Sequence, residues 1–212
     1  MQYTKENLKK LDEHIEMIPL MVDAAFKSVM TKNTNLFKRY LIETLDIDID
    51  PNNSNLIFLD KELIKENYKE KGKTVDLNVK LGSNLLITVE VNRYNFEDVK
   101  RKNKLFLEKL HTMQYEVGDE YKDLRSKYIY QLNLNAKDKY KNKGENIVVF
   151  YDITDNCVYD DNEKIYIKHL EYYKEMFYTD ASKMKFDEIF MAGMMATSFT
   201  DIYNIMKYIL SK

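Results

Sequence analysis

Two apolar segments joined by Gly82-Ser83-Asn84 constrain the fold of this chain more than any other feature. Residues 74–81 and 85–91 alternate in the manner of strands, and a three-residue connection containing glycine is typical of a β-hairpin. Such a loop places Leu81 opposite Leu85 and thereby fixes every other pair. One side of the hairpin is then wholly apolar. Because a slip by one residue would bury charges and expose valines, we expect this register to be strongly preferred.

The other side of the hairpin brings two acidic residues together. The register places Asp76 directly opposite Glu90, and the Cβ atoms of such a pair lie roughly 4.5–5.5 Å apart. Like charges so placed destabilise a sheet by about 0.2–1 kcal/mol and raise each other's pKa unless a cation lies between them. Mg²⁺ or Mn²⁺ would relieve the repulsion, polarise a phosphate and lower the pKa of a bound water. Asn92 projects from the same face and could orient that water or a phosphate oxygen.

Three other interpretations of the acidic pair stay open at this point. The two acids could belong to a solvated strand face where they merely happen to meet. Lys80 or Lys73 could neutralise them as well as a metal ion would. A shift of the register by two residues would separate the acids diagonally.

Apolar periodicity elsewhere predicts an α/β fold with a mixed sheet flanked by helices. We expect helices at 4–17, 22–31, 34–45, 95–117 and within 171–211, and strands at 55–60, 127–135, 146–154 and 164–170 beside the hairpin. The charged segment 61–73 is typical of an exposed loop. The helix at 95–117 is long enough for a right-handed crossover between parallel strands. This order predicts an N-terminal helix in 1–20, a core in 21–170, and a helical C-terminal appendage in 171–212 that packs on the same domain.

Composition narrows the classes of function. The chain has 33 Lys and Arg against 35 Asp and Glu, which argues against a uniformly basic nucleic-acid binder but allows a basic face around an acidic centre. Its one cysteine, Cys157, excludes an internal disulfide framework and a zinc site of several cysteines. The sequence contains no signal-peptide pattern and no apolar run of ~18 residues, so we expect a cytoplasmic protein without a membrane partner. The three histidines lack acidic or cysteine partners at ligand spacing and are expected to be structural.

Four segments resemble the PD-(D/E)XK nuclease superfamily in their order and spacing. They are VDAAFKSVM (22–30), KGKTVDLNVKL (71–81), LLITVEVN (85–92) and VGDEYKDLRSKYIYQLNLN (117–135). The chain is most similar to the branch of recombination-promoting nucleases and PD-(D/E)XK nuclease family transposases. The resemblance implies a restriction-endonuclease-like core and Mg- or Mn-dependent hydrolysis of phosphodiester bonds. DNA is the implied substrate, with RNA as the other candidate, and a homodimer is compatible with it.

The resemblance also implies roles for individual residues. Asp76 and Glu90 become the metal-binding carboxylates, and the main-chain carbonyl of Val91 completes the metal site. Asn92 is assigned to the catalytic set, but it stands where the family usually has Lys or Gln. Because Asn brings an amide dipole in place of a positive charge, this departure predicts slower chemistry or none.

Further residues have both a functional and an ordinary interpretation. Asp23 matches an additional acid of the family but could equally cap a helix, and Glu43 could reach the site or face solvent. The basic residues after Glu90 could contact phosphates or form a solvated helix face. These basic residues are Arg93, Lys100, Arg101 and Lys104.

The sequence is therefore compatible with three different functions. The first is a Mg-dependent PD-(D/E)XK endonuclease. The second is a catalytically degenerate nuclease fold that binds nucleic acid or a protein, for example in a mobile element or phage. The third is a structural protein assembled through the Met- and Tyr-rich C-terminal helices.

Overall fold

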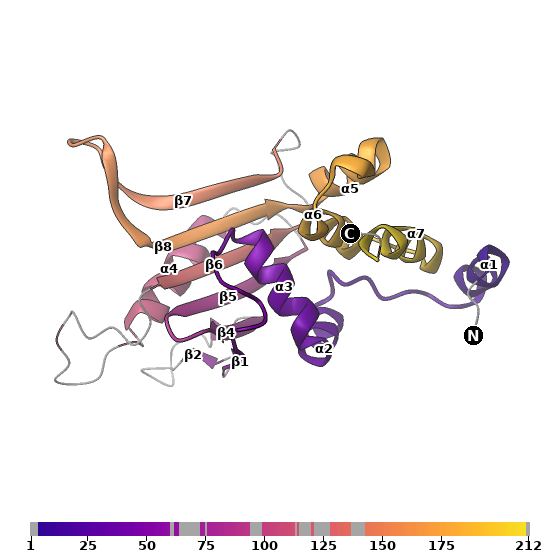
Figure 1. The fold of residues 1–212 in the computed structure, drawn as a ribbon, viewed down its shortest axis with the longest axis horizontal. Helices are drawn as coiled ribbons and strands as arrows, with labels where there is room; N and C mark the ends of the chain where they lie inside the picture. Colours follow the sequence, from indigo (N-terminus) through magenta and orange to yellow (C-terminus); the bar gives the residue numbers. More distant parts are fainter. Residues whose placement is uncertain are drawn as a thin grey trace.

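A mixed β-sheet forms the centre of the protein (Figure 1). The computed structural model describes residues 4–59, 62–63, 73–74, 76–93, 99–112, 114, 120, 128–136 and 143–210. Within these residues, the main sheet has six strands in the order β1-β4-β5-β6-β8-β7, and β2 and β3 form a separate two-stranded sheet. The strands are β1 (Leu56–Phe58), β2 (Glu62–Leu63), β3 (Lys73–Thr74), β4 (Leu77–Leu81), β5 (Leu85–Asn92), β6 (Tyr128–Asn135), β7 (Glu145–Asp152) and β8 (Cys157–His169).

The direction of the strands confirms the predicted class. β4 and β5 are antiparallel, whereas β5, β6 and β8 run parallel to one another. The helix α4 (Val99–Thr112) lies between β5 and β6 in the sequence, where a crossover was predicted. The protein is therefore an α/β fold with a mixed sheet flanked by helices.

The two faces of the sheet pack against different helices. The odd-numbered residues of the hairpin, such as Val79, Ile87 and Val89, belong to the main core, which also contains residues of α2 (Asp23–Lys32) and α3 (Thr34–Thr44). On the opposite face, α4 packs through a smaller apolar cluster. Its members are Leu86, Phe106, Leu107, Leu110 and Ile129. The period-two alternation of the strands thus assigns each hairpin residue to one of two distinct environments.

The C-terminal helices continue the main core. They are α5 (Leu170–Asp180), the 3₁₀ turn Ala181–Lys183, α6 (Phe186–Met194) and α7 (Phe199–Ile209). The ring of Phe190 on α6 lies 4.7 Å from that of Tyr40 on α3, centroid to centroid. The helix α1 (Lys5–His14) lies at the far end of the molecule against α7 (Figure 1). No helix in the described ranges combines the length and apolarity needed to cross a bilayer.

Several predicted boundaries differ from the observed ones. The first hairpin strand begins at Leu77 rather than at residue 74, and Thr74 pairs with Glu62 instead of lying opposite Asn92. Residues 61–73, predicted to be a loop, contribute β2 and the start of β3. The strand predicted at 164–170 begins at Cys157, because the pairing with β7 extends over an acidic segment that the apolar pattern did not include. The predicted cap at Gly118 and the ends of the helix at 95–117 lie outside the described residues.

Asp12 connects α1 to the first turn of α7 by hydrogen bonds. Its carboxylate accepts hydrogen bonds from the amide of Phe199 (2.6 Å) and from the amide and hydroxyl of Thr200 (3.2 and 2.6 Å). These hydrogen bonds, led by that of the Thr200 hydroxyl, lower the pKa of Asp12 from its ordinary 3.8. A carboxyl group whose pKa is lowered on folding stabilises the native state above its unfolded pKa and loses that contribution as the pH falls through the folded value.

We predict that Asp12→Ala lowers the melting temperature at pH 7 and releases α1, seen as faster amide hydrogen exchange in residues 5–14. The difference in melting temperature between wild type and variant should shrink as the pH falls below 3.8. Glu13→Ala, which changes the next and more exposed residue, is the matched control. A difference that is independent of pH would show that the loss comes from packing rather than from the carboxylate.

Candidate active site

Asp76 and Glu90 lie next to each other at one end of the hairpin. The observed pairs run from Leu81↔Leu85 to Leu77↔Val89, which is the predicted register, and the next position places Asp76 opposite Glu90. Both residues are buried, with exposed fractions of 8% and 3%. The register is thus confirmed, and the interpretation as a solvated strand face is wrong.

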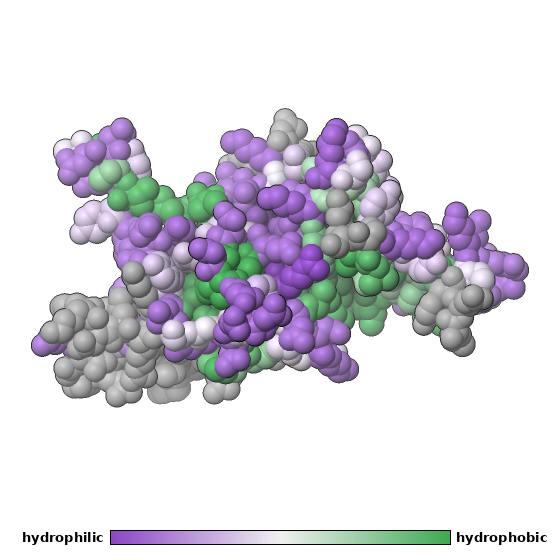
Figure 2. Space-filling view, in the orientation of Figure 1, coloured by the Kyte–Doolittle hydropathy of each residue, from purple (hydrophilic) through white to green (hydrophobic). Residues whose placement is uncertain are grey.

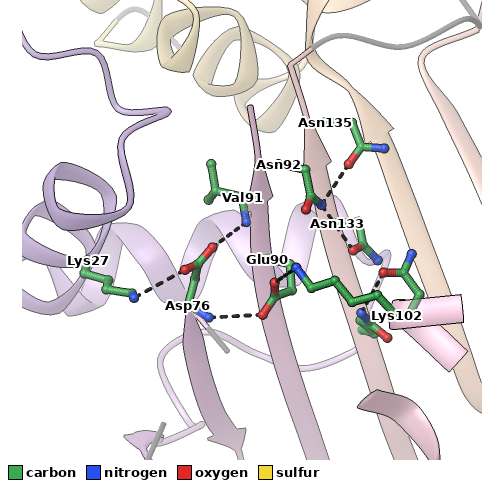
Figure 3. A network of polar contacts seen from close by, with 10 residues as sticks. Lys27, Asp76, Glu90, Val91, Asn92, Lys102, Asn133 and Asn135 are labelled. Atoms are coloured by element: carbon green, nitrogen blue, oxygen red, sulfur yellow. Dashed lines mark hydrogen bonds and ion pairs between the residues drawn. The ribbon is translucent and has the colours of Figure 1, made fainter. Parts of the chain in front are cut away.

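The two acids are held by main-chain hydrogen bonds across the pair (Figure 3). The amide of Asp76 donates to Oε1 of Glu90 (3.2 Å), and the amide of Val91 donates to Oδ2 of Asp76 (2.7 Å). Where β4 begins, hydrogen bonds to the two carboxylates therefore replace the main-chain hydrogen bonds of the sheet. These two hydrogen bonds fix the orientation of both acidic side chains without a ligand.

The main-chain carbonyl of Val91 faces the same side of β5 as Asp76. The N–H and C=O groups of one strand residue point to the same neighbouring strand, and the N–H of Val91 points to Asp76. The next residue points the other way, because the carbonyl of Asn92 accepts from the amide of Ala136 beyond β6 (2.9 Å). The carbonyl of Val91 therefore points from β5 toward the start of β4, where Asp76 lies.

Each carboxylate has a lysine partner from a helix on a different face of the sheet. Nζ of Lys27 on α2 lies 3.3 Å from Oδ1 of Asp76, and Nζ of Lys102 on α4 lies 2.6 Å from Oε2 of Glu90 (Figure 3). The sequence suggested Lys80 or Lys73 instead. Lys80 lies opposite Leu86, further along β4, and the side chain of Lys73 lies outside the described residues.

Burial dominates the electrostatics of Glu90. It raises the pKa of the Glu90 carboxyl above its ordinary 4.5; the Lys102 ammonium lowers the pKa, and the charge of Asp76 raises it again. Nζ of Lys102 also lies 5.3 Å from the ring centre of Phe106, so that its stem stays close to the apolar cluster under α4. The charged form of Glu90 is therefore destabilised by burial and by the charge of Asp76, and stabilised by Lys102 and by the hydrogen bond from the Asp76 amide.

A row of buried amides continues from the acidic pair across the parallel strands. Nδ2 of Asn92 donates to Oδ1 of Asn135 (3.0 Å) and lies 3.5 Å from Oδ1 of Asn133, the residue that pairs with Glu90 in the ladder (Figure 3). Nδ2 of Asn133 has no hydrogen-bond partner among the described atoms, although the residue is fully buried. A buried donor next to a buried carboxylate suits an ordered water or a ligand oxygen.

His169 belongs to the same row, and its partners are amides. It pairs with Asn135 in the ladder, and its Nε2 lies 2.8 Å from Oδ1 of Asn146 on β7. The sequence alone gives only weak signals for these partners. The alternation of Gln131, Asn133 and Asn135 in β6 indicates a polar face, but Lys27 and Lys102 carry no pattern that distinguishes them from other helical lysines.

The two additional acids lie on α2 and α3. Asp23 is exposed in the first turn of α2, and the N-cap residue is Val22, so the prediction that Asp23 caps this helix is wrong. Glu43 accepts from Nε of Arg39 (2.7 Å) and is close enough to Asp187 on α6 to raise the pKa of that carboxyl. The prediction of solvent exposure for Glu43 is only partly right, because its side chain is half-buried.

The four predicted phosphate-binding residues are spread around α4 and its approach. Arg93 directly follows β5 and is exposed, as is Arg101. Lys100 and Lys104 line a groove between α4 and the β7–β8 hairpin, on a different side of the helix from Lys102. Their role in binding nucleic acid stays a prediction.

The donor atoms at the pair suit a hard cation. Within the described ranges, no cluster of three or more His, Cys, Asp or Glu side chains could hold a metal ion. Mg²⁺ and Mn²⁺ bind through one or two carboxylates together with waters and phosphate oxygens, so the pair and the Val91 carbonyl fit these ions. Among the described residues, each carboxylate oxygen has one polar partner, and these partners use one of its two lone pairs.

Comparisons with known proteins do not extend this assignment: no family model, curated protein or solved structure matches the chain.

We predict that Glu90→Gln stabilises the protein at neutral pH, with a rise in melting temperature of about 2–4 °C, which is the change that roughly 1 kcal/mol makes in a chain of this size. Because the pKa of Glu90 is raised on folding, the folded state loses stability as the pH rises through 4.5, and glutamine removes that loss. The gain should therefore disappear at pH 4.

Melting curves at pH 7 and pH 4 test this prediction, with Glu108→Gln on the outer side of α4 as the matched control. A lower melting temperature for Glu90→Gln at pH 7 would mean that the ion pair with Lys102 outweighs the effect of burial.

Proposed function

We propose that this chain is a divalent-metal-dependent nuclease of the PD-(D/E)XK type, with a restriction-endonuclease-like core, that hydrolyses phosphodiester bonds in DNA. The observation that carries the proposal is the buried Asp76–Glu90 pair on adjacent antiparallel strands. Two carboxylates in a buried site are unfavourable for folding alone, and a buried acid with a raised pKa, as in Glu90, is typical of functional sites.

Some residues at the pair would bind the metal ion, and others position the groups that bind it. Asp76, Glu90 and the carbonyl of Val91 would hold Mg²⁺ or Mn²⁺, which when bound polarises the scissile phosphate and activates a water. The amide of Val91 and the amide of Asp76 keep the two carboxylates in place. Asn92 is fixed by Asn135 and would orient a water or a phosphate oxygen.

Lys102 compensates in this proposal for the missing lysine of the motif. Asn92 stands at the position where the family usually has Lys or Gln, but Lys102 brings an ammonium group from α4 to within 2.6 Å of Glu90. Its side chain is partly exposed and can therefore reach a phosphate beside the pair. A positive charge there would stabilise the negative charge that develops during attack on phosphorus.

Nucleic acid is the substrate that fits these charges best. Arg93 and Arg101 are exposed next to the strand and helix that carry Glu90 and Lys102. Phosphate contacts of this kind supply affinity without sequence preference. DNA follows from the resemblance to nuclease-type transposases, and RNA is the second substrate to test. The cytoplasmic setting rests on the sequence alone.

The second candidate is a degenerate nuclease fold that binds nucleic acid or a protein without cleavage. One observation favours it: Lys27 and Lys102 already neutralise Asp76 and Glu90, so the pair is balanced without any metal ion. The absence of a lysine at position 92 points in the same direction.

We predict that Mn²⁺ or Mg²⁺ raises the melting temperature and supports cleavage of plasmid DNA. An ion at 100 times its dissociation constant adds about 2.7 kcal/mol of stability. Asp76→Asn and Glu90→Gln should each lose the thermal shift and reduce cleavage by at least about 100-fold, whereas Glu108→Gln should keep both. Binding of DNA without metal-dependent cleavage, unchanged in both site variants, would favour the degenerate fold.

We predict further that Lys102→Met reduces cleavage by about 10²–10³-fold, the effect of removing one group that stabilises developing charge. Asn92→Lys should restore much of this activity in the double variant, because it returns an ammonium group to the face that carries Glu90. Single-turnover rates of the four proteins measure the effect, and Lys109→Met serves as the control on α4. Failure of Asn92→Lys to rescue would assign Lys102 a structural role only.

A further inference from the structure

The outer half of the β7–β8 hairpin leaves the sheet as a projecting arm, defined as residues 149–162 (Figure 1). The pairing of β7 with β8 shifts between Val148↔Ile165 and Phe150↔Asp160. β8 pairs with β6 only from Glu163 onward. Among the strands that the structure describes, the arm therefore pairs only within its own hairpin. A two-stranded hairpin by itself is marginally stable in water.

The arm exposes an unusual amount of apolar surface. Ile153 at its tip is 89% exposed and Tyr159 is 78% exposed, and Phe150, Tyr151 and Val158 are exposed as well. Figure 2 shows hydrophobic side chains along this projection, between polar ones. Exposed apolar side chains gathered on a projecting element are typical of a protein contact.

The tip of the arm is already ordered. Oδ1 of Asp152 accepts from the amides of Thr154 (2.8 Å) and Asp155 (3.0 Å), and Asn156 has a positive φ of 54° that closes the turn. A preformed tip loses little conformational freedom when it docks, which favours binding.

The arm is also acidic. The arm has no Lys or Arg and four acids: Asp152, Asp155, Asp160 and Asp161. Such a segment repels a nucleic-acid backbone, so its partner is a protein surface that is apolar and positively charged.

A groove with these properties lies at the base of the arm. It has a volume of about 430 Å³ and runs between α4 and the sheet. Leu107, Val148, Ile165 and Ile167 give it an apolar lining, and Lys100 and Lys104 stand at its helical side. The helix itself carries five Lys and Arg against one acid, Glu108. Glu163 lines the groove on the side of the sheet, so the groove complements the arm in hydropathy and, on the side of α4, in charge.

From this complementarity we infer that two copies of the chain exchange arms, with the apolar acidic tip of each arm seated in the α4 groove of the other. Phe150 belongs to the arm and also lines the groove, so the two surfaces are contiguous on one copy. A two-fold axis near Phe150 places the arm of each copy in the α4 groove of the other copy. Such an assembly closes at two copies. The inference uses neither acid of the proposed active site and does not depend on cleavage.

Analytical ultracentrifugation of the full chain tests the dimer. We expect a concentration-dependent dimer whose dissociation constant rises at least tenfold in Ile153→Asp, at the arm tip. Ile15→Asp, at another exposed isoleucine far from the arm, is the matched control and should leave the dimer intact. Because Ile153 is almost fully exposed, circular dichroism of the variant should match wild type.

Charge reversal identifies the two surfaces. Lys104→Glu and Asp155→Lys should each weaken self-association, because positions 104 and 155 then carry like charges. An equimolar mixture of the two variants should restore dimers, since each arm then faces a groove of opposite charge. Cys157, the one cysteine of the chain, should also form an intermolecular disulfide with Lys104→Cys under mild oxidation, and Lys9→Cys should not.

A monomer at every concentration would overturn the inference. It would equally be overturned by a dimer that tolerates Ile153→Asp, or by a mixture of the charge variants that stays monomeric. If Lys104→Glu instead weakens DNA binding without affecting association, the groove is a nucleic-acid surface and not an arm site.

Discussion

The antiparallel pairing of β4 with β5 is the constraint on which the rest of the molecule depends. Its odd-numbered residues, among them Val79, Ile87 and Val89, are fully buried and share one core with α2 and α3. The same register turns Glu90 and Asn92 to the opposite face and brings Asp76 beside Glu90. Because the side-chain period of a strand is two, a slip that moved the acids would also expose the core. Hydrophobic burial therefore holds the site in place, although no apolar side chain takes part in it.

The lysines show how a buried acidic pair can persist in a folded chain without a ligand. Lys27 and Lys102 approach from helices on the two faces of the sheet and contact different carboxylates. Removing either lysine would leave a carboxylate uncompensated, which is more unfavourable in a buried site than on the surface. The packing of α2 and α4 is thus coupled to the charge state of the pair. Any ion that binds there must share the carboxylates with these two ammonium groups.

The sequence predicted the elements that depend on local patterns. The hairpin register followed from the apolar alternation and the glycine-containing loop, and with it the position of Asp76 opposite Glu90. Lys27 and Lys102 could not be predicted, because their positions depend on how two helices dock on the sheet. The long β8 was missed for another reason. Its first half is acidic and exposed, and strand pairing with β7 rather than burial maintains it.

One helix separates the proposed active site from the proposed arm site. Successive residues of an α-helix are about 100° apart, so Lys102 lies about 200° around the helix axis from both Lys100 and Lys104. Lys102 accordingly meets Glu90, whereas Lys100 and Lys104 face the groove under β7 and β8. Basic residues that are adjacent in sequence therefore serve two different surfaces. The charge composition of α4 does not distinguish Lys102 from Lys100 and Lys104. The direction of each side chain relative to the sheet distinguishes them.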